Sequence, residues 1–514
     1  MSNTRLQRNT AYFITAQVLN RGSYAGLLVA LTYMFGIGAR TDVFFVALTI
    51  PMMVVNITMD GCFVTVLRAL SKTDREEQRW AVVGQSLLLF ATVYSAIAVI
   101  IAGGAGELVR LTAPGLQPES RNHAIGLLRL AATMVPAQGI GQVVGSTLIH
   151  RERVAAGAWR PAVVSMLSVI AAFGGAALLG ARVGVFLGGM VAGVWVGNLA
   201  YLVYLLKDRR GFRLEFRFRR QITDIFISAL VNSGNNIPTN VALLVERGVA
   251  TLFGPGALSA INLARTCLNL VGAPAAAAAN STFVEAVMLP AVASDREVGR
   301  RRAGMLYGPL FISTPILALL TVDSLLVVVF LFEHGHAGVI NAAVVARILL
   351  ILVASFPFLI CSTGLLRMYQ AAYLDKWYLA VLSVGTAIYA AVAVVFGRRW
   401  GVEGLAGIYS VSFDLITVTL VIIAIQRLGR DVIALPWMRW LVAASCSLLL
   451  LLLRGLLPSL RSPVAELLLD SGVAVIAYLG AGWVVDLPGV RVVGKQILRW
   501  TTSRATAWAS RRVE

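Results

Sequence analysis

The sequence predicts an all-α polytopic membrane protein with about 14 transmembrane helices, built as two pseudo-symmetric six-helix lobes plus two extra C-terminal helices. Hydrophobic residues make up 58% of the chain and charged residues only 13%, a balance that soluble proteins do not show. Apolar windows of about 18 residues or more recur along the whole sequence, each long enough to cross a bilayer as a helix. A motif that occurs twice, 218 residues apart, suggests the division into lobes.

Fourteen segments have the length and composition of membrane-crossing helices, and they leave no separate soluble domain. The chain starts with a mildly basic stretch that has no small-residue cleavage site, so we expect a retained first span rather than a signal peptide. The predicted spans are 11–34, 42–66, 80–103, 122–149, 159–180, 184–206, 222–250, 257–291, 304–330, 342–366, 377–397, 404–426, 440–457 and 464–485.

Basic residues are unevenly distributed between the two sides of the membrane. With the N-terminus inside, about 31 of the 44 basic residues fall on the inner loops and the two ends, and about nine on the outer face. This bias predicts that both termini are cytoplasmic. Orientation and contact with anionic lipid headgroups then account for the net charge of +19, and we expect no nucleic-acid partner.

The sequence Phe-Gly-x-Gly-Ala forms the repeated motif, at 35–39 and again at 253–257. Six predicted spans separate the copies, so both turns should lie on the outer face, and the halves should be parallel repeats, an organisation common in secondary transporters. The expected parts are an N-lobe at 1–206, a cationic cytoplasmic linker at 207–221, a C-lobe at 222–426, spans 13 and 14 at 427–485 and a basic cytoplasmic tail at 486–514.

Arg21 lies about ten residues into the first span. An arginine at the centre of a membrane helix costs about 2.5–3.5 kcal/mol on insertion scales, so a deep arginine should face a cavity or a partner. Snorkelling to the interface is the alternative explanation, and the depth of Arg21 disfavours it.

The seventh span carries polar residues with the i, i+3, i+4, i+7, i+8 spacing of one helical face. Gly234 and Pro238 lie among them and can break or bend the helix, freeing backbone groups for a ligand or ion. The face could line a cavity, or it could form interhelical hydrogen bonds that only hold helices together. Its residues are Asn232, Asn235, Asn236, Thr239 and Asn240, and in the eighth span Asn262 and Arg265 again share a face.

Acidic residues near or within spans have two possible roles. Thr41 can N-cap the second span and the helix dipole favours Asp42 in its first turn, so Asp42 is either structural or part of the site. Asp60 and Asp414 are harder to explain as caps and are candidates for ion coupling. Glu246 and Arg247, near the outer end of the seventh span, could bind substrate or simply pair with each other.

Neither a metal site nor a bound cofactor is expected. The four cysteines fall within apolar segments without Cys-x-x-Cys spacing, and no two of the four histidines have metal-ligand spacing on a predicted helix. An enzyme such as a membrane glycosyltransferase would normally present carboxylates on a large outer loop, whereas the longest outer loop, at about 104–121, holds only Glu107 and Glu119 as acids. We therefore expect no catalytic activity.

Several loose motifs occur in one order along nearly the whole chain. They are FGIGARTDVFFVALTIP, DGCFVTVL, LTAPGLQPES, VERGVATLFGPGALSAINLAR, VMLPAVAS, LFEHG and WGVEGLAGIYSVSFDL. Their succession resembles the MurJ (MviN) lipid II flippases of the MOP exporter superfamily. The resemblance implies a bacterial inner-membrane protein with a cationic central cavity that moves an undecaprenyl-pyrophosphate-linked saccharide from the inner to the outer leaflet. It also implies that spans 13 and 14 form a groove for the lipid tail.

The resemblance also bears on individual residues. Arg21 and Asp42 stand where the family has functional arginine and aspartate, Asp60 where it usually has glutamate, and Glu246-Arg247 where it usually has Asp-Arg. The chain departs from the family at four positions, where Leu27, Leu28, Val55 and Asn56 replace an Arg-Asp pair and twin arginines.

These departures leave the substrate open between lipid II and an exopolysaccharide or O-antigen unit. A multidrug exporter of the same superfamily is a weaker alternative, because cationic drugs would favour a cavity rich in acids, whereas the deep residues here are mainly arginine. Coupling to proton, sodium or membrane potential is expected. The expected partners are the lipid-linked substrate, membrane lipids and the machinery of cell-envelope glycan synthesis.

Overall fold

The computed structural model describes residues 3–487 and 490, except for 72, 74, 152, 208–219, 288–294, 333–338, 373, 430–436 and 457–461. The greater part of the predicted linker at 207–221 and of the tail at 486–514 lies outside the described residues, as do the side chains of Asp60, Asn232 and Asn235. The described part of the chain is helical and contains no strand, which confirms the predicted fold class.

Seventeen α-helices and two short 3₁₀ helices make up this part of the chain. Their bounds are α1 Asn3–Phe35, α2 Ala39–Ser71, α3 Glu76–Gly103, α4 Ala105–Thr112, α5 Pro118–Ala132, α6 Met134–His150, α7 Val154–Leu179, α8 Val183–Leu206, α9 Arg220–Ser233, η1 Gly234–Asn236, α10 Ile237–Ala250, η2 Thr251–Phe253, α11 Ala257–Val287, α12 Asp295–Val322, α13 Ser324–Phe332, α14 Val339–Ala371, α15 Asp375–Leu428, α16 Trp437–Arg454 and α17 Pro463–Val484.

The predicted spans coincide with these helices. Within the described residues, ten segments are long and apolar enough to cross a membrane by themselves. One of them, in α15, contains two predicted spans, at 377–397 and 404–426. Gly401 lies between them and has non-helical backbone angles (φ 68°), so a kink divides the long helix into two spans. The predicted spans at 11–34, 222–250 and 257–291 are also helical and correspond to α1, to α9 with η1 and α10, and to α11, but they are not among these ten segments.

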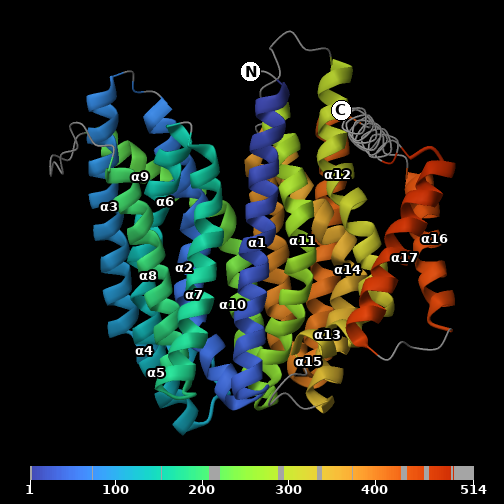
Figure 1. Cartoon of the computed structure of the whole chain (residues 1–514), viewed down its shortest axis with the longest axis horizontal. Coiled ribbons are helices and arrows are strands. Elements are labelled where there is room, and N and C mark those ends of the chain that lie inside the picture. The colour runs from blue at the N-terminus through green and yellow to red at the C-terminus, as the bar shows by residue number, and fades with distance from the viewer. Residues whose placement is uncertain are drawn as a thin grey trace, which may run out of the picture. The chain divides into compact units, whose positions relative to one another are not determined.

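The first of two compact units comprises residues 1–273, 331–355 and 375–416. In it α7 packs along α8 and α1, while α2 lies against α5, α6 and α9 (Figure 1). Small residues permit the closest approach, since a Cβ added to Gly193 of α8 would meet the backbone of Leu167 and Ser168 in α7. The apolar stripes of these helices thus pack directly on one another, as membrane helices do where small residues line the interface.

The second unit comprises residues 274–330, 356–374 and 417–514. Here α16 and α17 pack side by side and both contact α12 (Figure 1). Tyr478 is buried and packs beside Phe311, and the Trp440 indole N–H donates a hydrogen bond to the Thr314 hydroxyl at 2.8 Å. The indole N–H of Trp440 is therefore satisfied by a hydroxyl of a neighbouring helix.

Candidate functional site

The two copies of the repeated motif form similar turns, although Gly256 of the second copy also has positive φ (91°) and the equivalent Gly38 does not. Gly36 and Gly254 occupy equivalent positions and both have positive φ, at 72° and 98°. Glycine reaches this region without the strain that a Cβ causes. In each copy the helix begins at the alanine of the motif, α2 at Ala39 and α11 at Ala257. The motif recurs because each half needs the same glycine turn before a helix.

Asp42 of the first turn caps the helix of the second. Its carboxylate accepts hydrogen bonds from the backbone N–H of Gly256 at 2.5 Å and of Ser259 at 2.8 Å, and lies 2.5 Å from the Ser259 hydroxyl. The first N–H groups of a helix have no partner within it, and the glycine that precedes α11 has no side chain to supply one. Asp42 is buried, and its negative charge at the N-terminus of α11 also favours the helix dipole.

Equivalent residues of the two repeats touch each other at this point. The hydroxyls of Thr41 and Ser259, which are 218 positions apart like the motifs themselves, lie 2.8 Å from each other. Gly38 and Gly256 are a second equivalent pair in close approach. Contacts between equivalent positions mark a two-fold axis. Both turns therefore lie side by side, as they would in parallel repeats.

The predicted role of Thr41 as the N-cap of α2 is wrong. The helix begins two residues earlier, at Ala39, and the Thr41 hydroxyl instead reaches back to accept a hydrogen bond from the Gly38 N–H at 2.9 Å. This is the geometry of a residue in the third helical position, which bonds back to the residue that precedes the helix.

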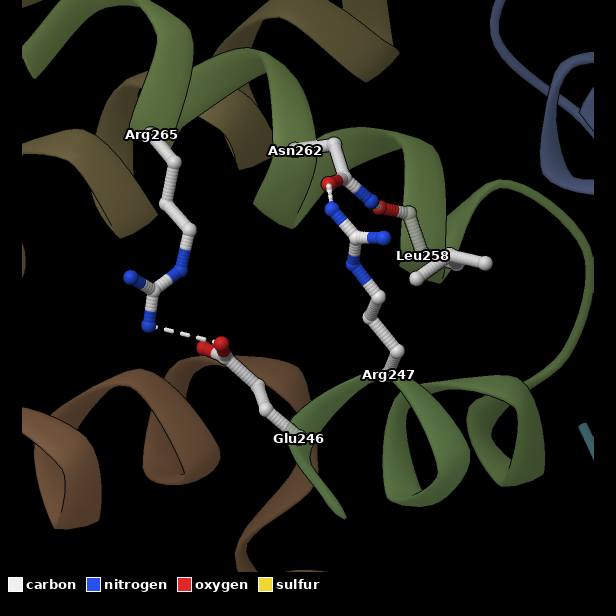
Figure 2. A network of polar contacts seen from close by, with 5 residues as sticks. All are labelled: Glu246, Arg247, Leu258, Asn262 and Arg265. Carbon is white, nitrogen blue, oxygen red and sulfur yellow. Dashed lines mark hydrogen bonds and ion pairs between the residues drawn. The ribbon is translucent and has the colours of Figure 1, made fainter. Parts of the chain in front are cut away.

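Glu246 and Arg265 form a buried ion pair between α10 and α11. The Arg265 guanidinium lies 2.6 Å from a Glu246 oxygen, and its carbon lies 3.8 Å from the centre of the Tyr409 ring. The Glu246 side chain is 1% exposed. Figure 2 shows Arg265 extending from α11 toward Glu246 on α10. Glu246 thus pairs with Arg265 rather than with its sequence neighbour Arg247.

Arg247 bridges three helices beside this pair. Its guanidinium donates to the Thr49 hydroxyl of α2 at 3.0 Å and to the Asn262 carbonyl oxygen of α11 at 3.2 Å, as Figure 2 shows for Asn262. A small pocket of about 20 Å³ lies next to it, lined by Thr49, Asn56, Asn240, Arg247 and apolar side chains. That volume holds about one water molecule. Asn262 and Arg265 therefore face α10 together, as their spacing predicted.

The polar segment of the seventh span is not one continuous α-helix. α9 ends at Ser233, η1 spans Gly234–Asn236, and α10 begins with Pro238 in its first turn. This confirms the break predicted at Gly234 and Pro238. Asn236 donates to the backbone carbonyl of Asn56 at 3.3 Å.

The other polar residues of this segment vary in burial. Asn240 donates to the carbonyl of Asn236 at 2.8 Å, so its amide satisfies the backbone at the break. Thr239 is half-buried. The side chains of Asn232 and Asn235 lie outside the described residues. The structure therefore locates the predicted polar face only through Asn236, Thr239 and Asn240.

Two further predicted site residues, Arg21 and Asp414, lie on α1 and α15. Arg21 is exposed on α1, one residue after Asn20, which accepts a hydrogen bond from Ser165 of α7 at 2.6 Å. Asp414 on α15 accepts a hydrogen bond from the Ser355 hydroxyl of α14 at 2.8 Å. Asp60 lies on α2, and its side chain is outside the described residues.

One buried arginine was not predicted from the sequence. Arg160 of α7 is 4% exposed and donates to the Asn198 side-chain oxygen of α8 at 2.7 Å. Gly141 and Gly145 of α6 leave room for its guanidinium. The signal available was this pair of glycines four residues apart, since small residues on one helix admit a large side chain from another. Tyr409, which stacks on Arg265, and Ser259 were missed as well.

The described residues contain no group of three or more histidine, cysteine or acidic side chains placed to hold a metal ion. The polar groups at α2, α10 and α11 instead consist of arginines, amides and hydroxyls around one buried glutamate. Such groups bind oxyanions or bond to one another across helices.

Comparison with known proteins gives consistent matches. A family model described as lipid II flippase MurJ matches residues 31–478. The probable lipid II flippase MurJ of Synechocystis sp. is 29% identical over 231 residues, a match that covers 40% of this chain and 43% of that relative. The chain is thus aligned with less than half of the relative's length.

Solved structures match over most of the chain. A lipid II flippase MurJ in an inward closed conformation matches with a TM-score of 0.75 and 15% identity, covering 93% of this chain and 98% of that one. An inward-facing multidrug resistance MATE family transporter of the MOP superfamily matches with a TM-score of 0.66 and 15% identity, covering 82% and 98%. At this identity the structures establish the fold.

Proposed function

The chain belongs to the MurJ lipid II flippase family, and we propose that it translocates an undecaprenyl-pyrophosphate-linked saccharide, lipid II or a related lipid-linked oligosaccharide, from the inner to the outer leaflet by alternating access. MurJ flippases and the structurally similar MATE proteins are transporters. The observation that carries the proposal is the contact between the two repeats at Asp42, because a carrier needs a reversible closure at one end of its substrate path.

The bonds at Asp42 are suited to such a closure. Three hydrogen-bond donors at the start of α11 converge on one carboxylate of α2, one from Gly256, which precedes the helix, and two from Ser259. Hydrogen bonds to a charged group are individually strong, yet they break without any repacking of a core. We assign the contact to the closed outer side of the carrier, so that release of substrate outward requires Asp42 to leave α11.

The arginines supply the chemistry that the diphosphate needs. Polar groups stripped of water cost several kcal/mol each in hydrocarbon. A guanidinium replaces that hydration with paired charge-assisted hydrogen bonds to phosphate oxygens. Arg21 is exposed and available, whereas Arg265 is held by Glu246. In our proposal the incoming diphosphate competes with Glu246 for Arg265, and the return of Glu246 helps to expel it.

The remaining site residues have supporting roles in this proposal. Arg247 and the amides of Asn236 and Asn240 provide donors around the substrate path, and Asn262 accepts a hydrogen bond from Arg247 there. Asp414 and Asp60 are retained as the candidates for coupling to proton, sodium or membrane potential. Spans 13 and 14, which are α16 and α17, would hold the lipid tail.

An exopolysaccharide or O-antigen unit is the alternative substrate. Leu27 and Leu28, at positions where the family resemblance implies an Arg-Asp pair, are 3% and 0% exposed. These positions therefore belong to the protein core in this chain and contribute no cation to a substrate path. A saccharide that needs fewer cationic contacts than lipid II would suit such a carrier.

The proposed setting is the bacterial cytoplasmic membrane, with both termini in the cytoplasm. The excess of basic residues on the inner loops supports this orientation. The partners proposed are membrane lipids and the machinery that makes envelope glycans.

Rescue of a bacterial strain depleted of its lipid II flippase tests the substrate. Wild-type chain should restore growth, and Arg21→Ala should not, at equal amounts of protein in the membrane. Wild-type chain that is present in the membrane but fails to rescue would contradict lipid II as the substrate and favour the alternative glycan.

A further inference from the structure

A second polar cavity lies where α2 and α6 end and α3 begins. The excess of basic residues on the inner loops predicts that these helix ends are cytoplasmic. Its volume is about 350 Å³, and we call it the inner-end pocket. The polar lining consists of Arg79, Arg151, His150, Thr147 and Glu76, and the remainder is Trp80 with two aliphatic side chains, Leu70 and Val83. None of these residues belongs to the substrate path proposed above.

Both arginines of the inner-end pocket are held in place by contacts that leave donors available. Arg79 donates through Nε to the Thr73 carbonyl at 2.7 Å, which leaves its two terminal nitrogens. The Arg151 guanidinium lies 4.8 Å from the centre of the Trp80 ring. A guanidinium has five N–H donors in a fixed plane, so an anchored arginine still presents a pair of them to an oxyanion.

One acid opposes these cations. Glu76 accepts a hydrogen bond from Arg151 at 3.2 Å, but its side chain is 70% exposed and that of Arg151 is 30% exposed. Exposed ion pairs of this kind are weak. A phosphate can therefore displace Glu76 from Arg151 at little cost, and the basic groups outnumber the acid around the cavity.

The N-terminus of α3 adds to the preference for an anion. This helix of 28 residues begins at Glu76, and no side chain caps its first N–H groups. The positive end of a helix dipole therefore lies at the rim of the cavity. Glu76 and Glu77 lie in the same turn, but both are exposed and only Glu76 lines the cavity.

The apolar part of the lining indicates where the phosphate comes from. Trp80 is buried near the start of α3, and with Leu70 and Val83 it forms the apolar side of the cavity. Basic pockets between membrane helices on the cytoplasmic side suit lipid headgroups. We infer that the inner-end pocket binds the phosphate of an anionic phospholipid of the inner leaflet, with Arg79 and Arg151 as its donors and the acyl chains along α2 and α3.

Lipid binding by purified full-length protein tests this inference. The protein is placed in zwitterionic nanodiscs, and the dissociation constant for added phosphatidylglycerol is measured by native mass spectrometry. The double variant Arg79→Gln/Arg151→Gln should weaken binding by about tenfold or more, because each arginine contributes charge-assisted bonds. Glu76→Gln should strengthen binding, because it removes the competing carboxylate. The matched control, Arg110→Gln/Arg182→Gln, makes the same charge change at exposed positions of the opposite face and should leave binding unchanged.

Three results would overturn the inference. The first is an unchanged dissociation constant in the double variant, and the second is weaker binding in Glu76→Gln. The third is equal competition by inorganic phosphate, which would make the cavity a site for free anions. Since Glu76→Gln is expected to gain affinity, loss of folding cannot produce the expected pattern. The measurement is also independent of whether the chain transports a lipid-linked saccharide.

Discussion

Asp42→Asn should open the contact between the two repeats. The carboxylate accepts hydrogen bonds from three donors of Gly256 and Ser259, whereas an asparagine offers one oxygen and turns an NH₂ group toward the remaining donor. One charge-assisted bond is lost at about 1.5–3 kcal/mol, and the remaining bonds fall to neutral strength. The total is about 3 kcal/mol, roughly a hundredfold change in the equilibrium between closed and open outer ends. An open state populated at about 0.1% would rise to roughly 10%.

Distance measurements between spin labels at the two turns detect this change. Arg40 and Pro255 are exposed, one on each turn, and can be replaced by labelled cysteines after removal of the four native cysteines. Double electron–electron resonance on the reconstituted protein should show a new population with a longer distance between the two labels in Asp42→Asn. Glu107→Gln, which neutralises an exposed acid on the short helix α4, is the matched control and should resemble the wild type. Identical distance distributions in wild type and Asp42→Asn would refute the role given to the carboxylate.

Three further predictions concern the site and the packing around it. Arg265→Ala should abolish transport, but it also leaves Glu246 buried without its partner, at a cost of about 3–5 kcal/mol in stability. The double variant Arg265→Gln/Glu246→Gln should therefore be more thermostable than Arg265→Ala and equally inactive. Substantial transport by the double variant would contradict the cationic path. Asn236→Leu should slow transport more than Cys446→Ala does in the same vesicle assay, whereas equal tolerance would assign the asparagine to packing alone. Gly193→Ala should lower the free energy of unfolding by about 1–3 kcal/mol, because the new Cβ would meet the backbone of α7. Gly188→Ala, whose Cβ would make an ordinary van der Waals contact, is the control. Equal melting temperatures of the two variants would contradict the close packing of α8 on α7.

The fold was predictable because each span carries its own signal. Apolar length and loop charge are local properties, and the fourteen segments they indicate coincide with helices. The break in the seventh span followed from Gly234 and Pro238 in the same way. The cap on α11 did not, because nothing near Asp42 in the sequence shows that its partners lie more than two hundred residues away.

The sequence indicated which residue types form the site, but not which of them pair with each other. The spacing of Asn262 and Arg265 indicated one shared face, but the partners of that face depend on tertiary packing, and Glu246 pairs with Arg265 instead of its neighbour Arg247. Alignment of the two motifs does place Thr41 opposite Ser259, so the contact between the repeats could have been found from that equivalence. Arg160 was missed because its partner Asn198 and the glycines of α6 that make room for it lie on other helices, far from Arg160 in the sequence.

Translocation by purified protein in vesicles tests the central claim most directly. A fluorescent undecaprenyl-pyrophosphate-linked saccharide is placed in the inner leaflet, and its arrival in the outer leaflet is followed with a membrane-impermeant quencher. The account predicts rapid arrival with wild-type protein and a rate near that of protein-free vesicles with Arg21→Ala. Arrival at the protein-free rate with folded wild-type protein, for lipid II and for other lipid-linked saccharides alike, would contradict it.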